Sequence, residues 1–281
     1  MPAEAWTDSA ADMVTSTATD AAADAPTGTI GAGGARVVGP WDAPARGWYA
    51  RDVHEVARDL LGALLTRRSA AGDVTLRITE VEAYDGERDP GSHAFRGRTE
   101  RNRAMFGEPG RLYVYRHLGL HHCVNVVCGP VGRASAVLLR AGEVTDGVGL
   151  ARSRRVAAGR CDSDRQIARG PARLAVALDL DLRHYGAELT DPDGELVLHR
   201  ATDGPHRPPI ATGPRVGVSG DGGDGELFPW RYWLAGDPTV SAYRRVSARS
   251  RCAGAIDPRP HGPAPPARWA VGGRRPAARA R

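Results

Sequence analysis

Hydrophobic and polar residues follow two different periods in the segment that leads to residue 84. From Val53 to Leu65 the apolar residues recur at helical spacing, which predicts an amphipathic helix. Residues 70–73 read Ala-Ala-Gly-Asp and predict a turn. From Val74 to Ile78 apolar and polar residues alternate, which is typical of a half-buried strand. The segment therefore predicts a helix that leads through a turn into a strand.

The predicted strand ends in two carboxylates and a tyrosine, Glu80, Glu82 and Tyr84. If the alternation continues past Ile78, both carboxylates lie on the same face as the apolar residues. Partial burial there would raise the pKa of a carboxyl group, whereas a single bulge would reverse the two faces. A strand that ends in acidic side chains suits an active site, although most glutamates in such places are solvated or salt-bridged.

The rest of the chain predicts short strands and scattered helices. We expect a short helix at Thr99–Phe106, capped by Thr99, and a helix at Pro171–Leu178 with the proline in its first turn. The predicted strands are Leu112–Tyr115 and His121–Val127, which form a hairpin around Gly119, then Ala134–Ala141, Arg215–Val218 and Trp230–Leu234. Strands joined in hairpins with a few helices indicate an antiparallel α+β domain.

The two ends of the chain differ in composition from its middle. Residues 1–44 are rich in Ala, Gly and Thr and residues 247–281 in Arg and Pro, so both are expected to be disordered, with the folded domain at 45–246. Residues 1–46 carry a charge of −4 and residues 247–281 a charge of +7. The net charge of +5 leaves only +2 for the middle, which is a weaker nucleic-acid signal than the pI of about 9.3 suggests.

Composition excludes several classes of protein. No apolar run reaches membrane-spanning length, and Glu4, Asp8 and Asp12 stand where a signal peptide has basic residues. Four cysteines are too few for a disulfide framework in a chain of 281 residues. We therefore expect a cytoplasmic protein, associated with the nucleoid if the source is prokaryotic. All 38 basic residues are arginine, so lysine-based Schiff-base catalysis is excluded.

One cluster of histidines and cysteines raises the alternative of a metal site. It consists of His117, His121, His122, Cys123 and Cys128. Adjacent histidines on a strand face opposite sides, and no second pair of ligands stands at a zinc-like spacing, so we expect no metal. The sequence also contains no Walker-type phosphate loop, no Rossmann fingerprint and no G-x-S-x-G nucleophile elbow.

A series of short motifs, taken together, is more specific than any one of them. The motifs are Glu80–Tyr84, His93, Arg101–Phe106, Pro109–Tyr115, Cys123–Val126, Val137–Ala141, Arg169–Leu174 and Pro214–Val218. From about residue 47 to 246 this series closely resembles the alkyladenine (3-methyladenine) DNA glycosylase family. The resemblance implies a single compact α+β domain built on a curved antiparallel sheet with peripheral helices.

The resemblance also implies a role for each matching residue. Glu82 matches a general base that activates water, and Arg140 matches the arginine that helps to hold this water and the phosphate of the flipped nucleotide. The walls of the base pocket match Tyr84, His93 and Tyr115, and Asn125 matches the residue that disfavours guanine. Contacts with DNA are assigned to Tyr113, His117 and Leu118. Leu118 stands where the family often has a tyrosine wedge, and leucine is a plausible but weaker wedge.

The implied activity is a monofunctional, metal-free and cofactor-free hydrolysis of the N-glycosyl bond of alkylated or deaminated purines. The expected partner is double-stranded DNA, and we expect a monomer. An anionic glutamate suits an oxocarbenium-like transition state, and a cationic alkylated base stacks well on aromatic rings. Two alternatives remain open: a DNA-binding module in which Glu82 is dispensable, and a metal-dependent hydrolase that uses His117, His121 and Cys123.

Overall fold

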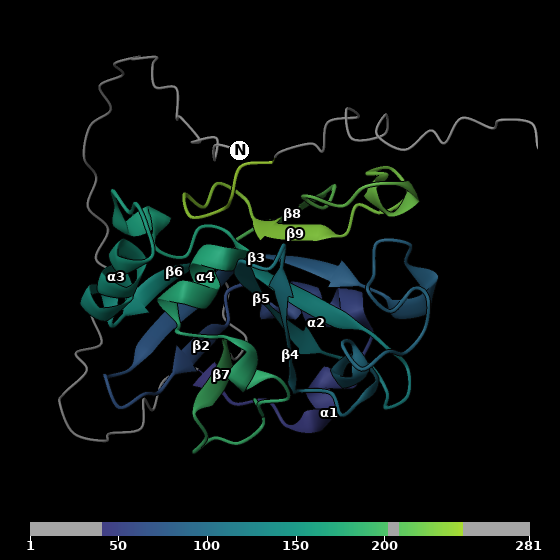
Figure 1. Cartoon of the computed structure of the whole chain (residues 1–281), viewed down its shortest axis with the longest axis horizontal. Helices are drawn as coiled ribbons and strands as arrows, with labels where there is room; N and C mark the ends of the chain where they lie inside the picture. Colours follow the sequence, from purple (N-terminus) through teal and green to yellow (C-terminus); the bar gives the residue numbers. More distant parts are fainter. Residues whose placement is uncertain (1–40, 202–207, 244–281) are drawn as a thin grey trace, which may run out of the picture. The chain divides into compact units, whose positions relative to one another are not determined.

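The computed structural model describes residues 41–201 and 208–243 (Figure 1). Within these ranges nine strands form one antiparallel sheet in the order β1-β7-β2-β3-β6-β5-β4, and β9 pairs with both β3 and β8. The strands are β1 (Trp41–Asp42), β2 (Leu64–Arg67), β3 (Val74–Tyr84), β4 (Leu112–His117), β5 (His121–Val127), β6 (Ala136–Asp146), β7 (Leu196–Ala201), β8 (Ile210–Gly213) and β9 (Arg231–Leu234).

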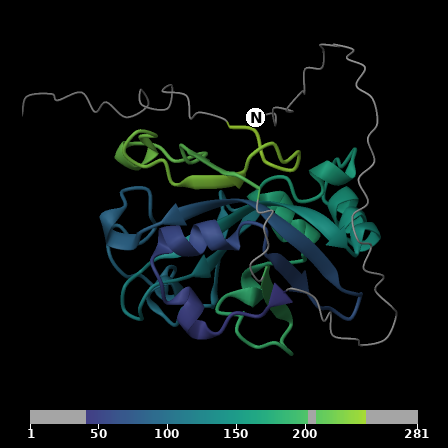
Figure 2. The ribbon, with the colours of Figure 1, turned by 180° about the vertical axis from the view of Figure 1, so that it is seen from behind.

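Helices lie at the periphery of this sheet. The α-helices are α1 (Arg46–Tyr49), α2 (Val53–Leu60), α3 (Val148–Ala157) and α4 (Pro171–Ala177). The short 3-10 helices are η1 (Gly86–Arg88), η2 (Arg103–Phe106), η3 (Asp164–Gln166), η4 (Leu182–His184) and η5 (Asp221–Gly223). Helix α4 lies in front of the sheet in Figure 1, and the view from behind brings α1 and α2 forward (Figure 2). The predicted α+β class with an antiparallel sheet and peripheral helices is confirmed.

Strand β3 runs through the middle of the sheet and brings the acidic residues to a junction of strands. It pairs with β6 along its length, with β2 at Val74–Arg77 and with β9 at Glu80–Glu82. The pairing with β6 is irregular between Ile78 and Val81. A bulge of this kind increases the local twist and re-aims the side chains that follow it.

Side-chain alternation along β3 changes at this irregularity. The even-numbered apolar residues in Val74–Ile78 belong to the hydrophobic core, but beyond the bulge the core residues are Val81 and Ala83. Glu80 and Glu82 therefore face away from the core. The expectation that unbroken alternation keeps them on the apolar face is wrong, because a one-residue irregularity exchanges the two faces of a strand.

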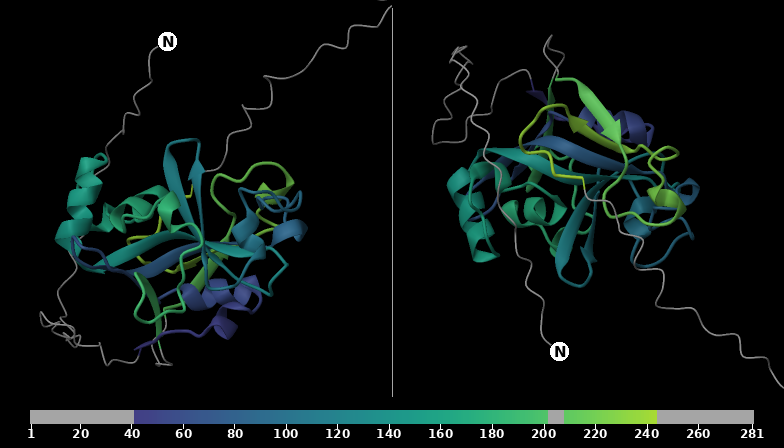
Figure 3. Two further views of the ribbon diagram at one scale, coloured as in Figure 1. Left: turned by 60° about the horizontal axis from the view of Figure 1, so that its bottom comes forward. Right: turned by 90° about the horizontal axis from the view of Figure 1, so that it is seen from above.

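Strands β4 and β5 form a hairpin that projects from the sheet (Figure 3). At its tip the backbone N–H of Leu120 donates to the carbonyl of His117 at 3.0 Å. Leu118 and Gly119 both have positive φ, 48° and 71°, as in the type I′ turns that suit the twist of a hairpin. Leu118 is 81% exposed and Leu120 76% exposed. The tip therefore presents two apolar side chains to solvent.

The predicted helix at Val53–Leu65 is shorter than its hydrophobic period suggests. It ends at Leu60, and Gly62 follows with φ of 83°, a conformation that a helix cannot contain. Leu64 and Leu65 then begin β2, where their apolar character serves a strand. A run of leucines fits both periods, and the glycine decides where the helix stops.

Two further predictions of local structure need correction. In the segment Thr99–Phe106 only Arg103–Phe106 is helical, as one 3-10 turn, because Thr99 and Asn102 exchange hydrogen bonds between their side chains and backbones. Residues 215–218 form no strand, and their neighbour β8 lies at Ile210–Gly213. The predicted strand at Trp230–Leu234 is present as β9, one residue shorter.

The predicted disordered ends fall largely outside the described residues, which begin at 41 and end at 243. Among the described helices, none has the length and apolar character needed to cross a membrane.

Candidate active site

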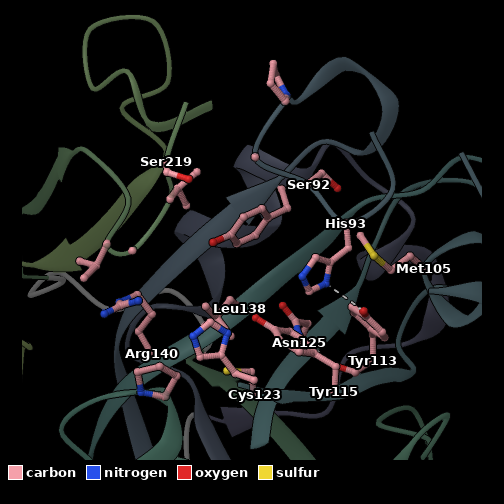
Figure 4. Close-up of a pocket in the computed structure, with 18 residues that line it drawn as sticks. Ser92, His93, Met105, Tyr113, Tyr115, Cys123, Asn125, Leu138, Arg140 and Ser219 are labelled. Atoms are coloured by element: carbon pink, nitrogen blue, oxygen red, sulfur yellow. Dashed lines mark hydrogen bonds between the residues drawn. The ribbon is translucent and has the colours of Figure 1, made fainter. Parts of the chain in front are cut away.

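A cavity of about 420 Å³ lies between the end of β3, the β4–β5 hairpin and the segment that follows β8 (Figure 4). Most of the residues predicted to form the site line it. They are Tyr84, His93, Tyr113, Tyr115, His117, Asn125 and Arg140. In Figure 4, Arg140 stands across the cavity from His93 and Met105.

One rung of the sheet explains why residues far apart in sequence meet here. Tyr113 on β4 pairs with Asn125 on β5, and Asn125 pairs with Leu138 on β6. Leu138 in turn pairs with Glu82 on β3. Paired residues of antiparallel strands project from the same face, so this rung gathers the polar groups on the side of the sheet that faces away from the core.

The Glu82 carboxylate is fully buried directly behind the cavity wall. Its Oε1 accepts a hydrogen bond from the backbone N–H of Val216 at 2.7 Å and lies 3.2 Å from Nη1 of Arg140. Its Oε2 accepts a hydrogen bond from the Tyr84 hydroxyl at 2.8 Å. The three residues that contact the carboxylate, Tyr84, Arg140 and Val216, all line the cavity. The carboxylate therefore lies one residue behind the lining of the cavity.

A second buried carboxylate, Glu80, anchors the arginine that contacts Glu82. Its Oε1 accepts hydrogen bonds from Nε of Arg140 at 2.9 Å and from Nε of Arg231 at 2.6 Å. Ser241 donates to the same group through its hydroxyl at 2.9 Å and its backbone N–H at 2.7 Å. Burial disfavours the charged form, but these donors outweigh burial and lower the pKa of Glu80. The expected rise in pKa on burial is wrong for this carboxylate.

A buried ion pair fixes the loop that carries Val216. Arg215 donates to both carboxylate oxygens of Asp89, at 2.6 and 2.7 Å, and both side chains are fully buried. The Arg215 guanidinium also lies 4.6 Å from the ring centroid of Tyr84, a cation–π distance. Burial and the charge of Glu82 raise the pKa of Tyr84 well above 10, so its hydroxyl stays a donor. Arg215 thereby supports two of the three groups that contact Glu82.

Aromatic side chains form the opposite wall of the cavity. Tyr113 and Tyr115 stack with centroids 5.5 Å apart, and His93 stands edge-on to Tyr115 at 4.5 Å. Nδ1 of His93 and the Tyr113 hydroxyl are 3.0 Å apart, drawn as the dashed line in Figure 4. Burial, with the charges of Arg101 and His117, lowers the pKa of His93 to about 4, so the ring is neutral at pH 7. A flat ring could stack in this cavity against neutral aromatic surfaces.

The floor of the cavity contains one amide and one thiol. Asn125 is buried and donates to the carbonyl of Tyr113 at 2.9 Å, which fixes the orientation of its amide. Cys123 is also buried, and burial raises the pKa of its thiol. A thiol with a raised pKa is a poor nucleophile, so Cys123 serves as an apolar lining group.

The residues assigned to DNA contact do not all meet in this cavity. Tyr113 and His117 line it, whereas Leu118 stands at the exposed tip of the hairpin. Among the residues that the structure describes, no group of three or more His, Cys, Asp or Glu side chains is placed to hold a metal ion.

A model of the methylpurine-DNA glycosylase family matches residues 47–238, which include every residue of the site up to Arg231. The chain belongs to this family. Relatives that carry the provisional name 3-methyladenine DNA glycosylase include one from Streptomyces avermitilis, 54% identical over 73% of this chain and 94% of its own. One from Leifsonia xyli is 56% identical over the same shares, and one from Nocardia farcinica is 50% identical over 69% and 88%. Membership in a family of DNA glycosylases supports a DNA-repair hydrolase that acts on N-glycosyl bonds.

Several members of the site have no assigned role in the sequence analysis. They are Glu80, Asp89, Arg215, Arg231 and Ser241. Glu80 and Arg215 lie within motifs that the methylpurine-DNA glycosylase resemblance rests on, but the side chains that they pair with lie 60 to 161 residues away in the chain. The local sequence offers one indication of a role for Glu80, which is a charged residue among apolar neighbours. Glu82 has the same kind of neighbours, so this indication does not distinguish the two.

Proposed function

We propose that this protein is a monofunctional, monomeric DNA glycosylase that excises alkylated or deaminated purines from double-stranded DNA in base excision repair. One observation supports it above all others. A buried carboxylate, Glu82, is held by an arginine, a backbone N–H and a tyrosine hydroxyl at the edge of an aromatic-walled cavity. The cavity's volume of about 420 Å³ lies within the range of small-molecule pockets.

The proposed reaction requires the damaged nucleotide to leave the duplex first. A base inside the helix is stacked on both sides, so its glycosidic bond cannot approach a buried carboxylate. Extrusion costs a few kcal/mol, and stacking between Tyr84 on one side and His93 and Tyr115 on the other offsets part of this cost. The exposed Leu118 at the hairpin tip is the proposed wedge that fills the gap in the duplex.

In the proposed reaction Glu82 acts as the general base. Its Oε2 accepts one hydrogen bond among the described residues, from Tyr84, and a carboxylate oxygen can accept another from water. As the bond between the sugar carbon and the purine nitrogen breaks, its electron pair leaves with the base. The water oxygen bonds to the sugar carbon and its proton passes to Glu82. The carboxylate also stabilises the developing oxocarbenium charge.

The proposed products are a free base and an intact strand with an abasic site. Strand cleavage by a lyase requires an amine that forms a Schiff base with the sugar. This chain has no lysine, and we propose that the terminal amine, the one remaining candidate, takes no part. Borohydride should therefore trap no covalent complex between the protein and DNA.

The proposed lesions are 3-methyladenine, 7-methylguanine and hypoxanthine. Alkylation of a ring nitrogen gives a cationic base, which leaves readily and binds well to aromatic faces. The fixed Asn125 amide is the group proposed to crowd the exocyclic amine of guanine, and its orientation by the Tyr113 carbonyl supports that role.

The deciding experiment is single-turnover release of base from duplexes that carry one 7-methylguanine or one hypoxanthine, with and without EDTA. Wild type should release base in both conditions. Glu82→Gln should bind the duplex but release base at least about 100-fold more slowly, the usual size of a general-base effect. Glu55→Gln, at an exposed position on α2, is the matched control and should behave as wild type.

Three outcomes would contradict the proposal. Lesion-independent binding without base release favours the DNA-binding module. Activity that EDTA abolishes but Glu82→Gln retains favours a metal-dependent hydrolase at the histidine cluster. A covalent complex of protein and DNA trapped by borohydride would show lyase chemistry and contradict the monofunctional mechanism.

A further inference from the structure

A second cavity of about 400 Å³ lies next to the first, along the edge of the sheet at β4. Its lining is Glu100, Arg101, Arg103, Val114, Arg116, Leu182 and Tyr185, together with Tyr115. Tyr115 lines both cavities, so this groove borders the proposed base pocket at that side chain. We refer to these eight residues as the edge groove.

The edge groove concentrates positive charge in a domain that is otherwise nearly neutral. It contains three arginines, Arg101, Arg103 and Arg116, and all three are exposed. Its one acid, Glu100, contacts Arg103 at 3.0 Å but is 91% exposed, and an ion pair so exposed contributes little. Within the described residues Arg101 and Arg116 form no salt bridge, so the groove has a clear excess of positive charge.

Aromatic rings hold two of these guanidinium groups in place. Arg101 lies 5.4 Å from the ring centroid of Tyr115, and Arg103 lies 5.9 Å from that of Tyr185. A guanidinium that packs over a ring leaves its N–H edge free to donate. Two planar donors that line one groove suit the oxygens of phosphate groups, which arginine binds in bidentate fashion.

The position of the groove indicates which phosphates it would meet. Arg116 is next to His117, which lines the base pocket, and two residues from Leu118 at the hairpin tip. A nucleotide inserted into the base pocket must remain joined to its neighbours through phosphodiester bonds. Its strand therefore has to leave the pocket along one of the surfaces that border it, and the edge groove is a bordering surface with the opposite charge.

We propose that the edge groove binds the phosphodiester backbone of the DNA strand that carries the extruded nucleotide, next to that nucleotide. This inference rests on the proposed glycosylase function, because the base pocket defines where the strand enters. The ligand chemistry is a run of phosphates, so the contact is independent of base sequence. Arg101 has a second role, because it packs against a wall of the base pocket.

The test compares the salt dependence of DNA binding by wild type and the double variant Arg103→Gln/Arg116→Gln. Each phosphate contact contributes about 0.9 to the slope of log K against log salt. The double variant should therefore lower the slope by about 1.8, so that it loses roughly tenfold less affinity than wild type between 50 and 200 mM salt. The change should appear with both lesion-containing and lesion-free duplexes. Arg160→Gln, which removes an 80% exposed arginine after α3, is the control and should leave the slope unchanged.

The outcomes separate this inference from the proposed function. If wild type releases no base, the proposed function fails whatever the slopes are. If wild type releases base and the double variant keeps the wild-type slope, the edge groove does not bind phosphates. A loss of slope of about 0.9 in Arg160→Gln, half the loss in the double variant, also overturns the proposal, since the effect would then follow from net charge alone. A melting temperature for each variant separates loss of contact from loss of fold.

Discussion

Glu80 and Glu82 are two residues apart on one strand, yet their surroundings give them different chemistry. Glu80 accepts four hydrogen bonds from Arg140, Arg231 and Ser241, which leaves it no exposed acceptor. Glu82 accepts hydrogen bonds from Val216 and Tyr84, and both of these residues line the cavity. The residue type is the same at both positions, so the donors around each carboxylate are what distinguish the proposed base, Glu82, from Glu80.

The first prediction concerns Glu80. Glu80→Gln is expected to slow base release by about 10-fold to 100-fold without abolishing it, because Arg140 loses its anchor while Glu82 remains. Loss of the Glu80 charge should let the Arg140 guanidinium move towards Glu82. The pH at which the rate of single-turnover release changes should then shift, in addition to the fall in the maximal rate. Glu143→Gln, at an exposed position on β6, serves as the control. An unchanged pH profile with a lowered melting temperature would mean that Glu80 is only structural.

The second prediction concerns the protonation of His93. Because its pKa is lowered from 6.5 to about 4, the ring should titrate near pH 4 when followed by NMR. The unfolded chain binds this proton below about pH 6.5 and the folded chain only below about 4. Folding stability from this residue therefore falls as pH drops through that window. Arg101→Gln should raise the midpoint, though not to 6.5, since burial remains the larger cause. A wild-type midpoint near 6.5 would contradict the buried, neutral ring.

At the scale of elements, the sequence predicts β3 to β6, their hairpin and β9, but it misses β1, β2, β7 and β8, places a strand at 215–218 that is absent, and extends the helix at Val53 too far. The predicted strands at Leu112–Tyr115 and His121–Val127 match β4 and β5, although burial there is continuous over Leu112–Val114 and Cys123–Val127 and does not alternate. The period that begins at Val53 continues past the true end of α2, since Gly62 alone stops the helix and the following leucines belong to a strand. No local pattern shows the bulge after Ile78, which sets the direction of Glu82, because it depends on pairing with β6.

The same limit applies to the site. The cavity lining from Tyr84 to Arg140 follows from motifs, each of which lies within a few residues of chain. The clamp formed by Asp89 and Arg215 and the anchor formed by Glu80 and Ser241 depend on contacts across the whole domain, and such contacts leave no periodic trace in a sequence.

The third prediction concerns the hairpin tip. Leu118 has φ of 48°, where an L-residue other than glycine pays roughly 1 kcal/mol. Leu118→Gly should relieve this strain, so its melting temperature should equal or exceed that of wild type. It should also lower the population of flipped nucleotide, as reported by 2-aminopurine fluorescence. Leu118→Tyr should raise that population, because an aromatic ring stacks better in the gap. Equal fluorescence for all three proteins would remove the wedge role.

At the scale of the whole molecule, the site is closed by two segments that come late in the chain. The loop after β8 brings Arg215 to Asp89 and Val216 to Glu82, and the segment after β9 brings Ser241 to Glu80. Both segments contact carboxylates of β3, so the centre of the sheet and the proposed base, Glu82, share the same supports. Stability and activity should therefore change together when one of these supports is removed.

The fourth prediction tests this coupling. Asp89→Asn leaves the buried Arg215 without its charge partner, and breaking a buried ion pair in this way typically costs about 3–5 kcal/mol. Denaturant unfolding should show that loss, and base release should fall because Val216 and Tyr84 lose their support. Asp162→Asn breaks an exposed pair with Arg160 and should change stability by no more than about 1 kcal/mol. Lower activity without lower stability would separate the two roles of Asp89.

The contact between Ser241 and Glu80 has a consequence for biosynthesis. The ribosome makes the proposed base, Glu82, about 160 residues before it makes Ser241, so most of the domain can begin to fold while the buried Glu80 still lacks two of its donors. A nascent or prematurely terminated chain would then contain the residues that line the cavity but not the hydrogen bonds from Ser241 to Glu80, the residue that anchors Arg140. Full activity of the proposed glycosylase therefore requires that synthesis has passed Ser241, because a shorter chain lacks the residue that helps to hold Glu80 and, through Glu80, Arg140.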